Sequence, residues 1–239
     1  MKILITNDDG ITSPVLPSLA RWAQKLGEVT VVAPKHEQSG KSQAIDFRNP
    51  VEIKRVPFDA DCEAWAVDST PADCVRFARN GLRTQYDLVI SGINKGFNLG
   101  HDIVYSGTVG AIFEAMRIGI KAIAISTDID CFDNAMREMD AIWSFITDKK
   151  LFDHAALLNV NIPGEASRGI RITRQGGMFY TDDYQALGND LYVQVGEPYR
   201  DGSTDLSVDI TAIHNGYVSI SPLTADRTDP VAYEKIKNL

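Results

Sequence analysis

The chain has 239 residues, 44% of them hydrophobic and 23% charged, which excludes a disordered or fibrous protein and fits one large globular domain. Its formal net charge of −8 argues against binding a nucleic acid polymer, although a small phosphorylated ligand is compatible with it. No apolar run approaches the roughly 18 residues that span a bilayer, no signal-peptide layout is present, and the three cysteines are widely spaced. We therefore expect no membrane association and a reducing, cytoplasmic location.

The first two thirds of the sequence alternate predicted strands and helices. Strands are predicted at 2–6, 28–34, 87–91, 121–126 and 155–163, and helices at 13–26, 71–82, 107–118 and 132–147. Ser13 and Pro14 resemble a helix cap followed by the first helical residue. Residues 44–56 resemble a hairpin that turns at Asn49 and Pro50. Continuous apolar strands separated by helices predict an α/β fold, a Rossmann-like, three-layer, doubly wound and mostly parallel sheet.

The pattern changes near residue 168. Residues 170–195 read as antiparallel strands or a long arm without interleaved helices, followed by a short helix, a glycine stop and a final strand. We therefore predict a catalytic core at 1–167. Residues 168–239 form a C-terminal extension with a β-hairpin arm and a closing strand or helix.

Two adjacent carboxylates follow the first predicted strand. The strand at 2–6 runs directly into Asn7, Asp8, Asp9 and Gly10. Neighbouring like charges repel, and burying either one is costly unless a positive charge compensates. A turn with a helix cap is one interpretation, because Asp-Gly is a common turn sequence. A site for a hard divalent cation is the other, because ligands bind at the carboxyl ends of parallel strands.

A second polar group lies in SGINKGFNLGHDIVYSGTVGAIFEA, residues 91–115. Its candidate ligands are two asparagines and the first residues of a predicted helix: Asn94, Asn98, Ser106, Gly107 and Thr108. Glycines permit close backbone approach, and the N–H groups and hydroxyls at a helix start suit a phosphate. The spacing is neither that of a P-loop nor that of a dinucleotide fingerprint. An ordinary glycine-rich loop followed by a helix cap stays the alternative.

Several motifs together resemble the SurE family, the survival protein E nucleotidases. They are NDDG near the N-terminus, AP and EQSG after the second strand, STPADCV, the long glycine/asparagine block, LNVNIP and GYVSISPL, and they cover most of the chain. The resemblance implies one divalent cation per subunit, Mg²⁺ or Mn²⁺. Its implied ligands are Asp8, Asp9, Ser39 and Asn94. Taken alone, Ser39 could equally be a turn residue before a glycine.

The resemblance also implies hydrolysis of nucleoside monophosphates, with Asp8 and Asp9 as the catalytic residues. We expect Asn98, Ser106, Gly107 and Thr108 to hold the phosphate oxygens. Either water or an aspartate could be the nucleophile; water is favoured because both aspartates are implied ligands. Activity toward 3′-nucleotides and polyphosphate stays open. A non-catalytic nucleotide sensor and a metal-dependent nucleotide-sugar transferase are the alternative functions.

Aromatic residues gather in the predicted extension: Phe179, Tyr180, Tyr184, Tyr192 and Tyr199. Exposed apolar surface of this kind is usually covered by a partner. The resemblance implies an arm exchanged between subunits, and exchange of identical elements is a low-cost route to a dimer. We therefore expect a homodimer or a tetramer with an exchanged C-terminal arm.

Overall fold

The computed structural model describes residues 1–200, 202–237 and 239. Its strands are β1 (Lys2–Thr6), β2 (Glu28–Pro34), β3 (Ile53–Arg55), β4 (Glu63–Val67), β5 (Leu88–Lys95), β6 (Lys121–Thr127), β7 (Leu157–Ile162), β8 (Ile170–Ile172), β9 (Asp183–Gly188), β10 (Leu191–Val195) and β11 (Val218–Leu223). Its helices are α1 (Leu16–Ala23), α2 (Pro71–Asn80), α3 (Gly107–Arg117), α4 (Phe132–Asp148), α5 (Asp209–His214) and α6 (Pro230–Ile236), with 3-10 turns η1 (Gly100–Val104) and η2 (Leu151–Asp153).

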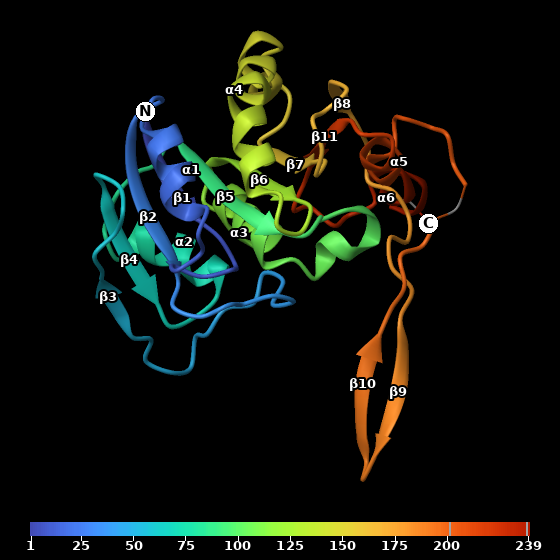
Figure 1. Ribbon diagram of the computed structural model, residues 1–239, viewed down its shortest axis with the longest axis horizontal. Coiled ribbons are helices and arrows are strands. Elements are labelled where there is room, and N and C mark those ends of the chain that lie inside the picture. The colour runs from blue at the N-terminus through green and yellow to red at the C-terminus, as the bar shows by residue number, and fades with distance from the viewer. Residues whose placement is uncertain (201, 238) are drawn as a thin grey trace.

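The predicted α/β architecture is confirmed (Figure 1). One sheet has the strand order β3-β4-β2-β1-β5-β6-β7-β11-β8, and β9 and β10 form a separate antiparallel pair. The central strands run parallel to one another, in the order β4, β2, β1, β5, β6 and β7. At the two ends of this group, β3 pairs with β4 and β11 pairs with β7 in the antiparallel sense. The chain leaves β1 on one side through β2 and returns on its other side as β5. The β1/β5 junction is therefore the topological switch point, where ligands bind in open parallel sheets.

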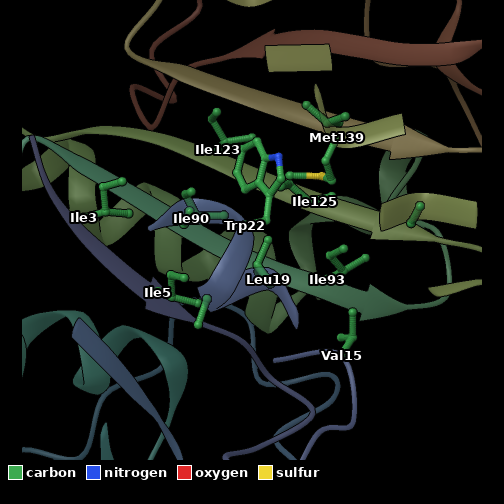
Figure 2. Close-up of a cluster of buried hydrophobic side chains, with 14 of the residues drawn as sticks. Ile3, Ile5, Val15, Leu19, Trp22, Ile90, Ile93, Ile123, Ile125 and Met139 are labelled. Carbon is green, nitrogen blue, oxygen red and sulfur yellow. The ribbon is translucent and has the colours of Figure 1, made fainter. Parts of the chain in front are cut away.

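Apolar side chains fill both faces of the sheet. Ile3 and Ile5 belong to the cluster that packs under α1 and α4, whereas Leu4 belongs to the cluster under α2 and α3. Figure 2 shows part of the first cluster, with Trp22 of α1 and Met139 of α4 among the labelled side chains. Burying a side chain of this kind contributes about 1.5–3 kcal/mol. The apolar clusters on the two faces of the sheet hold β1 and β5 in place, and so fix the position of the residues that follow these strands.

Two local predictions in the amino-terminal half are wrong. Helix α1 begins at Leu16 with Pro17 in its first turn, rather than at Ser13 with Pro14, and it ends at Ala23. Proline lacks an N–H, which makes the first turn the place a helix tolerates it. The backbone carbonyl of Ser13 instead accepts a hydrogen bond from the Leu16 amide at 3.2 Å, in the turn before the helix.

The predicted hairpin at 44–56 does not form. Only Ile53–Arg55 is a strand, and it pairs with β4. The carboxylate of Asp46 accepts from the backbone amides of Arg48 at 3.0 Å and Asn49 at 3.1 Å. This local side-chain turn competes with a strand ladder.

The C-terminal part contributes to both sheets. Strand β11 pairs with β7, and β8 pairs with β11 in the parallel sense, so residues beyond 167 extend the main sheet. The predicted arm is the hairpin β9–β10, which projects away from the rest of the molecule (Figure 1). Across residues 1–200, 202–237 and 239, no helix has both the length and the apolar character needed to cross a membrane.

Candidate functional site

The chain turns sharply after β1. The Asn7 side chain donates to the Gly10 carbonyl at 3.0 Å and accepts from the Gly10 amide at 3.2 Å. Gly10 has a φ of +97°, and a Cβ there would lie 3.2 Å from the Pro34 carbonyl oxygen. Only glycine adopts this conformation without strain. The turn holds Asp8 and Asp9 between the ends of β1 and β2, as the Asp-Gly sequence predicted.

Asp8 is buried against the start of α3. The Thr108 hydroxyl donates to Asp8 Oδ1. Gly107 permits this approach, because a Cβ at that position would lie 2.9 Å from the Asp8 Cβ. Burial raises the pKa of Asp8 above its ordinary value, and the Thr108 hydrogen bond opposes that rise. The Thr108 hydroxyl, expected to contact phosphate, therefore positions an aspartate.

Asp9 is compensated only in part, by the backbone amide and the charge of Lys95. Its Oδ2 is buried and has no hydrogen-bond partner among the described residues. Burial, and next the charge of Asp8, raise the pKa of Asp9 to about 6, while the backbone amide of Lys95 opposes the rise. The Lys95 ammonium lies 3.1 Å from Asp130 Oδ1, in an ion pair beside the site. Asp9, Lys95 and Asp130 share the lining of a cavity of about 250 Å³.

The loop after β2 approaches the same place. The Gln38 amide donates to the Asp8 carbonyl at 2.8 Å, which fixes the start of the loop. The Ser39 hydroxyl donates to Glu37 Oε1 at 2.7 Å and is exposed. The Glu37 charge raises the pKa of both aspartates. A third carboxylate, that of Glu37, thus lies near the pair. We did not single out Glu37 from the sequence, although its position after a predicted strand indicated this edge of the sheet.

Asn94 and Asn98 lie at the carboxyl end of β5 and differ in their surroundings. Asn94 is half-buried, and its Nδ2 donates to the Gly96 carbonyl at 2.9 Å. Asn98 is buried, and its Nδ2 donates to Ser126 Oγ at 2.7 Å. Because an amide nitrogen carries two hydrogens, Asn98 keeps a second donor for a ligand.

Two further asparagines hold the backbone of Asn98. The side chains of Asn159 and Asn161 in β7 each donate to the Asn98 carbonyl at 2.9 Å, and Asn161 Oδ1 accepts from the Asn98 amide at 2.9 Å. These three hydrogen bonds fix the backbone of Asn98, although the buried Oδ1 of Asn159 has no partner among the described residues. Their signal in the sequence is two polar residues at alternate positions of a buried strand.

The start of α3 combines an N-cap with first-turn amides, of which the Thr108 amide bonds to the Asp8 carboxylate. Ser106 is the N-cap, and its Oγ accepts from the Val109 amide at 3.1 Å. The amides of Gly107 and Thr108 belong to the first turn, whose N–H groups have no intrahelical acceptor. Together with the helix dipole they favour an anion at this end of α3.

The donor set fits a divalent cation. Buried Asp8 and half-buried Asp9 are adjacent carboxylates with raised pKa values, and one buried oxygen of Asp9 has no partner in the described part of the chain. Mg²⁺ and Mn²⁺ prefer carboxylate, amide and hydroxyl oxygens. In residues 1–200, 202–237 and 239, no three or more His, Cys, Asp or Glu side chains are grouped to hold a metal. The neutral oxygens of Ser39 and Asn94 are therefore needed to complete a ligand set.

Comparison with known proteins gives the family. The model of the family described as survival protein SurE matches residues 3–182. A 5′-nucleotidase SurE from Clostridium beijerinckii is 38% identical over 242 residues, covering 96% of this chain and 95% of the relative. One from Legionella pneumophila is 36% identical over 249 residues, covering 100% and 97%. The crystal structure of the SurE protein from Aquifex aeolicus superposes with a TM-score of 0.84 at 33% identity, covering 100% and 99% of the two chains. This chain belongs to the SurE family.

Proposed function

We propose that this protein is a metal-dependent phosphomonoesterase that hydrolyses nucleoside 5′-monophosphates to nucleoside and phosphate. The relatives named 5′-nucleotidase SurE align over nearly the whole chain. The observation that carries the proposal is the pair of buried Asp8 and half-buried Asp9 at the β1/β5 switch point. Asp9 Oδ2 has no hydrogen-bond partner among the described residues. We further propose that it acts in the cytoplasm, where its three free cysteines stay reduced.

The ligands we assign to a single Mg²⁺ or Mn²⁺ ion per chain are Asp8, Asp9, Ser39 and Asn94. When bound, such an ion polarises a phosphoryl oxygen and offsets the negative charge that develops during hydrolysis. Thr108 holds Asp8 in place through its hydroxyl. Because both carboxylates are used as ligands, we assign the attack on phosphorus to water, which leaves a nucleoside and inorganic phosphate as products.

The phosphate contacts we assign are the first-turn amide of Gly107, the Ser106 hydroxyl and the side-chain amide of Asn98, because the backbone amide of Thr108 bonds to the Asp8 carboxylate. The Ser106 oxygen accepts from Val109, so its own hydrogen can still be donated to a phosphate oxygen. Fixed donors aimed at developing charge are among the largest contributions to catalysis. The buried network around Asn98 keeps its donor in a constant position.

Phosphate release from a nucleoside 5′-monophosphate tests the proposal. We expect turnover with Mg²⁺ or Mn²⁺, its loss on addition of EDTA, and its recovery with excess Mn²⁺. A nucleotide sensor would bind the nucleotide without releasing phosphate, and a nucleotide-sugar transferase would require a sugar donor. Either outcome would exclude the proposal.

Two substitutions at α3 test the proposed roles of the Ser106 hydroxyl at the phosphate and of the Thr108 hydroxyl in positioning Asp8. We expect Ser106→Ala and Thr108→Val each to lower kcat by about 10²-fold, the loss typical of one transition-state donor or of its positioning. Thr70→Ala is the matched control, because Thr70 caps α2 through the Asp73 amide and has no place in the proposed site. Thr70→Ala is expected to lower thermal stability and to leave kcat unchanged. The same result for Ser106→Ala would mean that Ser106 is only a helix cap.

A further inference from the structure

An ion pair lies beside the proposed metal site and takes no part in the proposed reaction. Lys95 is the last residue of β5, directly after Asn94, and its ammonium lies 3.1 Å from Asp130 Oδ1. The two side chains are 48% and 78% exposed. Exposed pairs of this kind contribute little to stability, so stability does not explain the position of this pair.

A turn after β6 carries Asp130 to Lys95. Strands β5 and β6 are neighbours, with Lys95 opposite Thr127, so the chain that follows β6 passes the end of β5. In this turn the Cys131 amide donates to the Asp128 carbonyl at 3.2 Å. Asp130 has a φ of +59°, a conformation that aspartate adopts more readily than most residues. The turn therefore fixes where this carboxylate holds the ammonium.

Lys95 acts on Asp9 in two ways. The backbone amide of Lys95 donates a hydrogen bond to the Asp9 carboxylate. Burial is the main cause of the raised pKa of Asp9, and the charge of the Lys95 ammonium opposes it. The ammonium is nevertheless not bonded to Asp9 Oδ2, which has no hydrogen-bond partner among the described residues. It is therefore near enough to interact with the charge of Asp9 while it is bound to Asp130.

The cavity of about 250 Å³ brings these groups together. Asp9, Lys95 and Asp130 line it, and so does Ser13. Ser13 is 6% exposed, and its hydroxyl also has no partner in the part of the chain that the structure describes. An ammonium has three hydrogens on a flexible four-carbon stem. The unpaired oxygens of Asp9 and Ser13 therefore compete with Asp130 for the Lys95 ammonium.

We propose that Asp130 draws the Lys95 ammonium away from Asp9, and that this pair of residues thereby sets the affinity of the site for its divalent cation. A positive charge close to Asp9 repels a cation that binds there, and a negative charge attracts it. Within the ion pair the two charges offset each other. The inference rests on the proposed function, because it concerns the cation assigned there.

Calorimetric titration of Mn²⁺ into the EDTA-stripped protein at low ionic strength tests this inference. Lys95→Met keeps the length of the side chain and should lower the Kd for Mn²⁺ by about threefold to tenfold, the size of a charge interaction across a partly exposed site. Asp130→Asn should raise the Kd by a similar factor. The double variant should return to within about twofold of the wild type, because it removes both charges. At about 1 M NaCl, where the screening length is about 3 Å, these differences should shrink.

Lys25→Met is the matched control. Lys25 forms a 3.3 Å ion pair with Asp140 of α4 and does not line the cavity, so the Kd should equal that of the wild type. An equal gain in affinity in Lys25→Met would overturn the inference, because net charge would then be the cause. Changes of the same sign in Lys95→Met and Asp130→Asn, or no change in either, would also overturn it and leave the metal site in place. No Mn²⁺ binding by the wild type would overturn the proposed metal site itself.

Discussion

Asp9→Asn is expected to abolish phosphate release while making the metal-free protein more stable. The substitution keeps the shape of the side chain and removes the charge that we assign to cation binding. Asp8→Asn should also abolish phosphate release. It should keep the local structure, because the amide oxygen can still accept the hydrogen bond from the Thr108 hydroxyl. Wild-type turnover in both variants would rule out the assigned ligands.

The stability change follows from the pKa of Asp9, which is about 6 in the folded protein against an ordinary 3.8. Because folding raises this pKa, the folded state binds the proton more tightly. The contribution of Asp9 to the free energy of unfolding is therefore most favourable below pH 4 and becomes less favourable as the pH rises through 6. The cost at neutral pH is at most about 3 kcal/mol, an upper bound because water reaches part of the side chain.

Thermal unfolding at pH 7.5 in EDTA measures this cost. We expect a higher Tm for Asp9→Asn than for the wild type, and a difference that shrinks as the pH is lowered to 4. Asp59→Asn is the control for loss of one negative charge, because the Asp59 side chain is 88% exposed and its ion pair with Arg21 lies at the surface. A Tm difference that is the same at both pH values would contradict the assignment.

Replacing the hairpin at 183–195 by two glycines is expected to convert the protein to monomers and to weaken its activity. Every residue of β9 and β10 is exposed, including Leu187 at 62% and Leu191 at 61%. Exposed apolar surface of this extent is normally covered by another subunit. The Thr181 amide donates to the Glu197 carbonyl at 2.9 Å, so the base of the hairpin stays closed when the hairpin is shortened.

Light scattering at micromolar concentration measures the assembly. We expect a dimer or tetramer for the wild type and the mass of one chain for the shortened protein. The double variant Leu187→Gln and Leu191→Gln is a second test: it keeps the hairpin, removes only two exposed apolar side chains, and should also shift the assembly toward monomers. A wild-type protein that is already monomeric would contradict the exchanged arm.

The core was predictable because each element has a clear local signal. The run KILIT followed by Asp-Asp-Gly predicts both a buried strand and the turn after it. The hairpin at 44–56 was wrongly predicted because the Asp46 side chain binds two backbone amides that a strand would pair. That competition depends on a single carboxylate, and strand propensity does not describe it.

The candidate site was predictable as a set of strand ends, but not in its contacts. The rule that ligands bind at carboxyl ends of parallel strands brings Asp8, Ser39 and Asn94 to one edge. The sequence contains no signal that the Thr108 hydroxyl would bind Asp8 or that Asn161 would hold Asn98, because these pairs are separated by 100 and 63 residues. Such contacts follow from tertiary packing of α3 and β7.

Calorimetric titration of Mn²⁺ into the EDTA-stripped protein tests the central claim most directly, because it measures the ion without relying on turnover. We predict about one Mn²⁺ bound per chain in the wild type, and no binding at the same concentrations in Asp8→Asn or Asp9→Asn. Unchanged Mn²⁺ binding in both variants, or none in the wild type, would contradict a metal site built on these two aspartates.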